Sequence, residues 1–274
     1  MSTDLNHSEA KRYLALLEIP RSEPSLDALL RIVRAHITKV PFENISKLYR
    51  WKTSGANELI NLALFLNGIE QYHFGGTCYS NNYYLHQLLK YLGFNVVLCG
   101  ADMSRPDVHV VNIVRIAGRE YLVDVGYAAP FLEPLPRDLS TDYVISLGID
   151  QYVLNPKDRT GRSRITLYRN GTAIHGYLVN PLPRSIGEFA HVITDSFRPD
   201  ATFMNAVLLA RFNSNGSQVL HNMTFIESEG KTVRKNSIST TDELVAAIEK
   251  IFAIPSTISR VALDGLSMSQ DAWG

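Results

Sequence analysis

Cysteine is scarce in this chain of 274 residues, which contains only Cys78 and Cys99. Two cysteines cannot build a disulfide framework, so a packed core must hold the fold together. No charge of one sign prevails either, because 27 basic residues balance 27 acidic ones. Without a basic surplus or a basic run, the sequence predicts neither a nucleic-acid partner nor a membrane partner.

Long apolar runs are also missing. The stretch LINLALFL at 59–66 is among the longest and is too short to cross a bilayer. The polar start MSTDLNHSEAKR lacks the apolar core of a signal peptide, so we expect a cytoplasmic protein. Histidine, cysteine and acidic residues do not cluster at metal-ligand spacing, so no metal is predicted. The 45% hydrophobic content still suffices for a substantial core.

What the chain does carry is one cysteine in a setting suited to a nucleophile. In FGGTCYSNNYYLHQLLKYLGF a glycine pair suits a tight turn, Thr77 is an acceptable N-cap, and the pattern over 79–91 predicts a helix. Cys78 would lie in the first helical turn, where unpaired N–H groups and the helix dipole favour a thiolate. A free cysteine can also be simply a buried core residue, as we expect for Cys99.

A second stretch supplies the partners that a cysteine nucleophile requires. The alternating runs VHVVNIV and EYLVDVG flank Ala117-Gly118, a pattern that predicts a hairpin. A two-residue loop places His109 opposite Gly126 and diagonal to Asp124 on the same face, where the imidazole can reach the carboxylate. Each residue alone would pass for a polar strand residue or a turn-flanking acid. Together with the glycine-flanked thiol they indicate a Cys-His-Asp triad.

Several motifs resemble those of the arylamine N-acetyltransferases, a family of cysteine acyltransferases that use acetyl-coenzyme A. The resemblance covers roughly residues 8–215 and implies that Cys78, His109 and Asp124 are the catalytic triad. The matching features are the GG-x-C turn, Asn82 after the cysteine, VPFENI at 40–45, YLVDVGY at 121–127 and RPDATF at 198–203.

Beside the nucleophile the chain departs from the family pattern. Phe74 stands where the family usually has arginine before the glycine pair, and Ser80 where it usually has glutamate. Ala128 replaces a common second glycine after the aspartate. These changes leave the triad intact and leave the choice of substrate open.

The missing arginine raises the question of what pairs with Glu43, its partner in the family. Because a lone, partly buried carboxylate is costly, we expect a substitute cation, either Arg12 or Arg34, or else solvation of the acid. His73, which precedes Phe74, could restore part of the positive charge.

The pattern along the chain predicts an α+β fold: a helical bundle, an antiparallel β-barrel and an α/β lid around a cysteine-protease-like Cys-His-Asp core. Helices are expected over SLDALLRIVRAHI, ended by Pro41, and over NELINLALFL. Seven runs of period two follow between 95 and 179. Thr240 and Glu243 predict a capping box before LVAAIEKIF. The predicted domains are 1–92 (helical, carrying the nucleophile), 93–189 (barrel, carrying His and Asp) and 190–274 (lid).

The function that the resemblance implies is acetyl transfer from acetyl-coenzyme A to an arylamine, arylhydrazine or related amine through an acetyl-cysteine. Oxyanion donors are expected from N–H groups at the helix start, including that of Cys78, with Tyr79 as another candidate. Two alternatives stay open: an amide synthase or thiol hydrolase using the same triad on another acyl donor, and a binding protein that has lost turnover. The oligomeric state is left open.

Binding residues follow from the same resemblance, which implies a coenzyme A cleft between barrel and lid. The predicted amine-contacting residues are Phe42, Tyr127 and Phe203, and the predicted coenzyme A walls are Gly126, Arg198 and Phe203. Phe42 and Phe203 would serve equally well as core residues.

Overall fold

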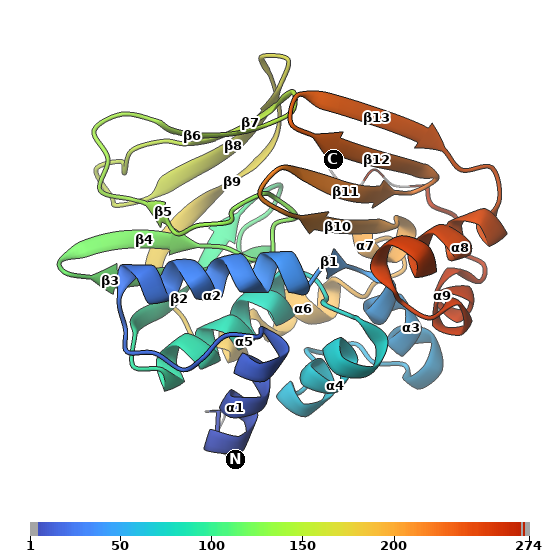
Figure 1. The fold of residues 1–274 in the computed structure, drawn as a ribbon, viewed down its shortest axis with the longest axis horizontal. Coiled ribbons are helices and arrows are strands. Elements are labelled where there is room, and N and C mark those ends of the chain that lie inside the picture. Colours follow the sequence, from blue (N-terminus) through green and yellow to red (C-terminus); the bar gives the residue numbers. More distant parts are fainter. Residues whose placement is uncertain (1–4, 270, 272–274) are drawn as a thin grey trace.

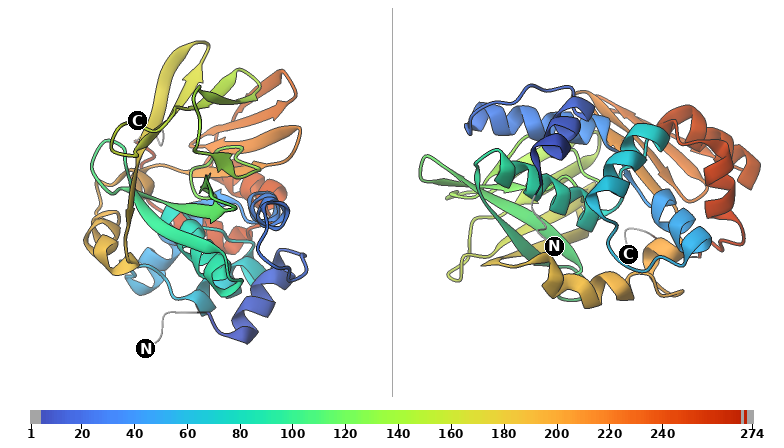
Figure 2. Two further views of the ribbon diagram at one scale, coloured as in Figure 1. Left: turned by 90° about the vertical axis from the view of Figure 1, so that its left-hand side faces the viewer. Right: turned by 90° about the horizontal axis from the view of Figure 1, so that it is seen from below.

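Two antiparallel sheets and a set of helices make up the structure, a computed structural model that describes residues 5–269 and 271. Most of the helices gather on one side of the two sheets, and α2 runs across them (Figure 1). Figure 2 shows the larger sheet curling beside the flatter C-terminal sheet. This arrangement confirms the predicted α+β class.

The predicted helices form, with shifted starts. Ser25 caps α2 by accepting from the Ala28 N–H, as a serine at this position should. The predicted helix at 57–66 begins later, because the Asn61 side chain caps it at the Leu64 N–H. The helices are α1 (His7–Leu16), α2 (Leu26–Lys39), α3 (Ile45–Ser54), α4 (Leu62–Tyr72), α5 (Cys78–Tyr91), α6 (Ala190–Asp195), α7 (Thr202–Asn205), α8 (Thr241–Phe252) and α9 (Ser256–Leu263), with a 3-10 turn at Ile186–Phe189.

The larger sheet has eight strands in the order β5-β4-β3-β2-β9-β8-β7-β6 and curls into a nearly closed barrel. Its β3–β4 ladder pairs Ile116 with Arg119 and Asn112 with Val123, which is the register that a two-residue loop requires. The predicted hairpin is therefore confirmed. The strands are β2 (Asn95–Asp102), β3 (His109–Ile116), β4 (Arg119–Val123), β5 (Leu135–Pro136), β6 (Tyr143–Leu147), β7 (Asp150–Leu154), β8 (Ser163–Arg169) and β9 (Thr172–Pro183).

The smaller sheet combines one strand from the N-terminal part of the chain with four from the C-terminal part, in the order β1-β10-β11-β12-β13. Its edge strand comes from the N-terminal part, where Phe42 pairs with Ala210. Helices α3, α8 and α9 share a second hydrophobic cluster with this sheet. The strands are β1 (Phe42–Glu43), β10 (Leu208–Phe212), β11 (Gly216–His221), β12 (Thr224–Glu229) and β13 (Thr232–Ser237).

The predicted capping box at α8 is only half present. The Thr240 hydroxyl accepts from the Glu243 N–H at 3.2 Å, as expected. The Glu243 carboxylate, however, accepts from the Ser239 N–H at 2.8 Å rather than from that of Thr240. The two hydrogen bonds at the start of α8 therefore involve neighbouring residues, Ser239 and Thr240, instead of both involving Thr240 as a capping box does.

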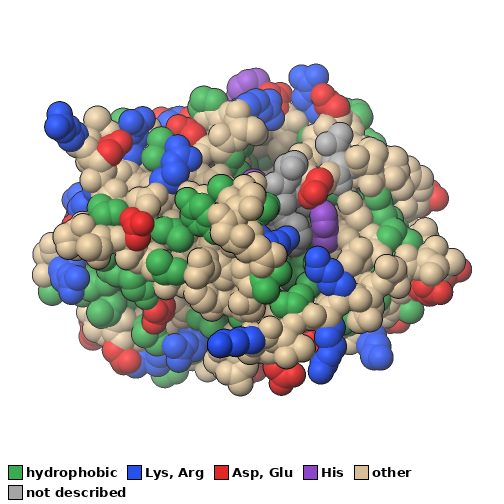
Figure 3. All heavy atoms as spheres, turned by 90° about the horizontal axis from the view of Figure 1, so that it is seen from above, with side chains coloured by type: hydrophobic (Ala, Val, Ile, Leu, Met, Phe, Trp, Pro, Cys, Tyr) green, Lys and Arg blue, Asp and Glu red, His purple; other side chains and the backbone are tan. Residues whose placement is uncertain are grey.

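Surface charges are mixed on the face drawn in Figure 3, where basic and acidic side chains are interspersed. This agrees with the balanced composition of the chain. Among the residues that the structure describes, no helix has the length and apolarity needed to cross a membrane.

Candidate active site

The turn before Cys78 has the predicted form. Helix α5 starts at Cys78, with Thr77 as an extended N-cap that makes no side-chain capping bond. The glycine pair before it is required by close packing, because a Cβ on Gly75 would lie 1.8 Å from the Pro41 carbonyl oxygen. Gly76 has a φ of +113°, which suits only glycine. The turn therefore places a buried thiol at the start of a 14-residue helix.

The histidine and the aspartate meet as the hairpin predicts. His109 begins β3, Asp124 follows β4, and His109 Nε2 lies 2.8 Å from Asp124 Oδ2 with both side chains buried. Burial lowers the pKa of His109, but attraction to Asp124 and contact with the Cys78 thiol outweigh it and raise the pKa to about 10. Burial pushes the pKa of Asp124 up, but His109 and the hydrogen bonds to the carboxylate bring it below its ordinary value. The pair therefore favours an imidazolium beside a carboxylate.

Four donors fix the Asp124 carboxylate. His109 and the Tyr177 hydroxyl, at 2.7 Å, donate to Oδ2. The Asn82 amide at 2.8 Å and the Gly126 N–H at 2.9 Å donate to Oδ1. Sequence reasoning placed Asn82 only through the resemblance and missed Tyr177, because β9 reaches this site by folding back from a distant part of the chain.

Asn82 also ties α5 to the hairpin. Its amide donates to the Val110 carbonyl at 2.7 Å, and its Oδ1 accepts from the Val125 N–H at 2.9 Å. Because Asn82 is fully buried and lies one helical turn after Cys78, it sets the distance between Cys78 and the Asp124 carboxylate. The site is thus held by side chains of a helix and by the segment after a strand.

The predicted binding residues come together in one cleft of about 580 Å³, which Cys78 and His109 also line. Its aromatic wall includes Phe42 and Phe203, whose ring centroids lie 5.6 Å apart. Charged side chains line another part of it, and of these sequence reasoning missed Arg105. The predicted residues that line it are Phe42, Gly126, Tyr127, Arg198 and Phe203.

The candidate oxyanion donors lie at the start of α5. The first N–H groups of a helix have no intrahelical acceptor, so those of Cys78 and Tyr79 are available to a ligand. The Tyr79 hydroxyl is engaged elsewhere, since it donates to the Asp107 carbonyl at 2.6 Å. Tyr79 can therefore contribute its backbone and not its hydroxyl.

The expected cation beside Glu43 is wrong for both candidates. Glu43 is fully buried and accepts from the backbone N–H groups of Ser46 at 2.8 Å and Gly75 at 3.1 Å. Arg12 instead pairs with Glu70, and Arg34 is exposed. Burial raises the pKa of Glu43, while these hydrogen bonds oppose the rise. Backbone donors, which sequence reasoning did not consider, bind the carboxylate directly, and the cation within electrostatic range of it is Arg50.

Both departures beside the nucleophile have local explanations. Phe74 belongs to the second hydrophobic cluster, and its ring packs 6.5 Å from that of Tyr49 and 5.4 Å from that of Tyr72. The Ser80 hydroxyl donates to the Thr77 carbonyl at 3.1 Å and closes the turn. Apolar packing at Phe74 and a local hydrogen bond at Ser80 thus stand where the family usually has charged groups.

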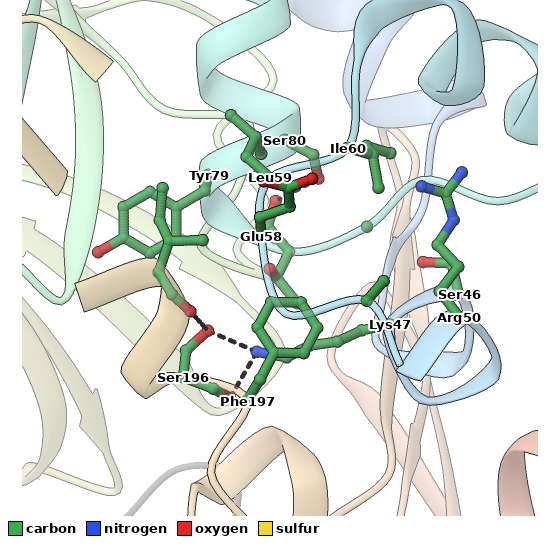
Figure 4. A pocket seen from close by; sticks show the side chains of 14 residues that line it. Ser46, Lys47, Arg50, Glu58, Leu59, Ile60, Tyr79, Ser80, Ser196 and Phe197 are labelled. Atoms are coloured by element: carbon green, nitrogen blue, oxygen red, sulfur yellow. Dashed lines mark hydrogen bonds between the residues drawn. The ribbon is translucent and has the colours of Figure 1, made fainter. Parts of the chain in front are cut away.

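A buried basic side chain near the turn is Lys47 of α3, which sequence reasoning missed. His73, the predicted substitute, is exposed at the end of α4. Lys47 is 9% exposed, and its Nζ donates to the Ser196 carbonyl and hydroxyl, each at 2.7 Å (Figure 4). Burial lowers the pKa of Lys47 to about 7, and the nearby Cys78 raises it slightly. No sequence signal marks it, because a helical lysine is ordinarily solvated.

Lys47 and Ser196 border a small pocket of about 50 Å³ beside the cleft. Tyr79 and Ser196 line both cavities and form the partition between them. The Lys47 ammonium also lies 4.1 Å from the centre of the Phe197 ring. Within the described ranges, no group of three or more histidine, cysteine or acidic residues could hold a metal ion.

Comparison with known proteins identifies the family. A family model described as N-acetyltransferase matches residues 25–261. The arylamine N-acetyltransferase pineal gland isozyme NAT-3 of Gallus gallus is 27% identical, over 77% of this chain and 80% of that protein. Proansamycin X synthase of Amycolatopsis mediterranei is 22% identical, over 83% and 90%.

Solved structures share the fold. The arylamine N-acetyltransferase of Mycobacterium abscessus superposes with a TM-score of 0.78 at 20% identity, over 94% of each chain. That of Mycobacterium marinum in complex with CoA gives 0.78 at 20% identity, over 94% of this chain and 99% of that one. Fold and family match define an acyltransferase. The chain belongs to the arylamine N-acetyltransferase family, whose chemistry is acetyl transfer with coenzyme A.

Proposed function

We propose that the enzyme moves an acetyl group from acetyl-coenzyme A to the nitrogen of an arylamine, arylhydrazine or related amine by way of an acetylated Cys78. The observation that carries this proposal is the buried pair of His109 and Asp124, 2.8 Å apart, in contact with the Cys78 thiol at one cleft. Since Nε2 of His109 is held by Asp124, Nδ1 is the nitrogen left for the thiol.

In the first stage the Cys78 thiolate attacks the thioester carbonyl. The oxyanion that forms accepts hydrogen bonds from the N–H groups of Cys78 and Tyr79 at the helix start. The carbon–sulfur bond to coenzyme A then breaks, and imidazolium His109 gives its proton to the departing thiolate. Acetyl-Cys78 and free coenzyme A are the products.

In the second stage the amine attacks acetyl-Cys78. Neutral His109 accepts the proton that the nitrogen loses, and the bond to Sγ breaks to release the amide. The thiolate and imidazolium return, stabilised by Asp124, whose four donors hold it in place. Asp124 orients the ring and stays ionised throughout.

Coenzyme A is proposed to enter the same cleft. The Mycobacterium marinum relative was solved in complex with CoA. Arg105 and Arg198 line the cleft here and can pair with phosphate groups, while Gly126 and Phe203 form walls. The amine would bind against Phe42, Tyr127 and Phe203.

A second candidate is an amide synthase or thiol hydrolase that uses the same triad on another acyl donor. The relative named proansamycin X synthase, matched over 83% of this chain, shows that similar chains carry more than one name. The third possibility, a binding protein without turnover, is disfavoured because the triad side chains make the contacts that catalysis needs.

Intact-mass measurement after brief exposure to acetyl-coenzyme A, without an amine, tests the proposal. We expect one acetyl group on the protein and none on the Cys78→Ala variant, which leaves the rest of the site in place. The adduct should disappear when an aromatic amine is added. A folded protein with a reactive thiol and no adduct would point to another acyl donor, and an unreactive thiol to the binding protein.

A further inference from the structure

We propose that His175 contacts the acceptor amine and donates a hydrogen bond to an oxygen substituent on it, so that the enzyme prefers arylamines that carry a carboxylate or carbonyl. This inference rests on the proposed function, because it concerns the amine of the second stage. His175 lines the same cleft as Cys78 and His109 and has no part in the chemistry described above.

The position of His175 is set by an irregularity in β9. Its partner in β8 is Leu167, whereas the next pair joins Tyr168 to Ala173, so Ile174 is an extra residue in the ladder. A bulge of this kind interrupts the alternation of a strand and re-aims the adjacent side chains. Ile174 is 42% exposed, and His175 keeps its place lining the cleft.

Aromatic contacts fix the plane of the imidazole. The Tyr127 ring lies nearly parallel to those of Phe131 and His175, with centroids 5.9 and 5.6 Å away and interplanar angles of 14° and 12°. The same Tyr127 ring meets the catalytic His109 edge-on at 5.8 Å. His175 and the catalytic base thus both contact the Tyr127 ring.

One hydrogen bond assigns the proton on His175. The Tyr127 hydroxyl lies 2.8 Å from His175 Nδ1. Burial, together with nearby Tyr152 and Asp124, raises the pKa of Tyr127 well above its ordinary value, so the hydroxyl keeps its proton. Because a buried hydroxyl that donates to nothing is costly, we assign its hydrogen to the bond with His175. In the described part of the chain the partner of this hydroxyl is Nδ1, which therefore accepts. The ring hydrogen then lies on Nε2.

The remaining nitrogen is therefore a donor. Nε2 of His175 has no hydrogen-bond partner among residues 5–269 and 271, and the side chain borders the cleft. Burial, followed by repulsion from His109, lowers the pKa of His175, with Asp271 opposing. A neutral ring with its hydrogen on Nε2 donates from that atom and cannot accept there, so it selects an oxygen acceptor.

The cleft around this donor supplies the rest of the specificity. Phe42, Tyr127 and Phe203 offer aromatic surface to a substrate ring. A pocket of aromatic walls with one directed polar group orients a ligand through that group. The acceptor class is therefore an aryl amine whose ring carries a hydrogen-bond-accepting oxygen.

Binding of two probes of similar shape tests this inference without turnover. 4-Aminobenzoate carries the oxygen acceptor and 4-methylaniline lacks it. Calorimetry in the Cys78→Ala background should show that His175→Phe, which keeps an aromatic ring for stacking, weakens 4-aminobenzoate about tenfold. Binding of 4-methylaniline should change by less than about twofold.

Two further variants sharpen the test. His175→Gln retains an N–H donor and should recover most of the preference for 4-aminobenzoate, whereas the surface control His191→Phe, with a side chain 83% exposed, should change neither probe. Equal weakening of both probes by His175→Phe, or no change in either, would overturn the assignment. Acetylation of Cys78 in the wild-type protein is measured separately, so a failure of the proposed function would be seen there and not in the ratio of the two affinities.

Discussion

Residue 126 must be glycine, because the surrounding packing leaves no room for a Cβ. A Cβ there would lie 2.6 Å from Cys78 Cα and 2.8 Å from the Asn82 amide nitrogen. Gly126→Ala should therefore lower the free energy of unfolding by about 1–3 kcal/mol and displace the nucleophile from its partners. Urea unfolding and the rate of Cys78 acetylation measure the two effects.

A matched control for this substitution is Gly187→Ala. A Cβ at Gly187 would meet no atom within 4 Å, and its φ lies outside the left-handed region. Its acetylation rate should stay at the wild-type value, and its stability should stay level or rise by up to about 1 kcal/mol, because alanine loses less backbone entropy on folding. If Gly126→Ala behaved like Gly187→Ala, the close contact between Gly126 and the nucleophile helix would not constrain the site.

The buried Lys47 gives stability a dependence on pH. The folded-state pKa is about 7 against an ordinary value of 10.5, because burial disfavours the charged form. Between these values the unfolded chain binds more protons than the folded one. The contribution of Lys47 to the free energy of unfolding therefore rises with pH. Lys47→Met should remove about 2–4 kcal/mol of this rise between pH 7 and 10.

The measurement is urea unfolding of wild type and Lys47→Met across that pH range. Replacement of the lysine also removes the two hydrogen bonds to Ser196, which shifts the variant by a similar amount at every pH. The difference in slope, rather than the offset, reports the titration. Parallel curves would show that Lys47 stays protonated when buried.

Residues joined by local geometry were the ones that the sequence made predictable. Spacing around a two-residue loop was enough to place His109 and Asp124 together, and the glycine pair was enough to place Cys78 on a helix start. Tyr177 and Lys47 were missed, because each reaches the site through the packing of elements far apart in the sequence. Nothing in their immediate neighbours distinguishes them from ordinary strand and helix residues.

At the scale of elements, the β3–β4 turn carries a correctable strain. Ala117 and Gly118 both have positive φ, 49° and 78°, as a tight hairpin of this kind requires. Alanine is disfavoured in that conformation, so Ala117→Gly should raise the free energy of unfolding by about 0.5–1 kcal/mol. Chemical denaturation detects a change of this size.

Ala173→Gly is the contrasting substitution, since Ala173 is an exposed residue of β9 whose φ is not positive. Glycine in a strand costs about 0.5–1 kcal/mol, so the same exchange should have the opposite sign there. A loss of stability in both variants would argue that the turn is relaxed with alanine in place.

The same contrast explains which elements could be predicted. The β3–β4 ladder forms between neighbours in sequence, and its register followed from the loop length alone. The pairing of β1 with β10 joins segments separated by most of the chain, and a two-residue strand has no periodicity to reveal it. The predicted helix start at 57 failed because a capping side chain, Asn61, outweighed the apolar pattern before it.

At the scale of the whole molecule, the N-terminal and C-terminal parts are built into one another. Phe42 and Glu43 form an edge of the C-terminal sheet, and Asn44 follows directly. The buried Asn44 amide donates to the carbonyls of Phe203 at 2.9 Å and Ala206 at 2.7 Å, and its oxygen accepts from the Leu208 N–H at 2.9 Å. The predicted helical and lid domains therefore share a sheet, and we expect them to unfold together.

Asn44→Ala tests this coupling. Removal of the amide leaves the Leu208 N–H and two carbonyls without their partner inside the protein, so the free energy of unfolding should fall by about 2–4 kcal/mol. Asn95→Ala, at an exposed position of β2, should cost less than about 0.5 kcal/mol. Hydrogen exchange should then show α2 and β10 losing protection by the same amount in Asn44→Ala, because they open in one transition. Loss confined to β10 and β11 would instead mean that the lid opens alone, and the cleft between lid and barrel would then admit substrate by local unfolding.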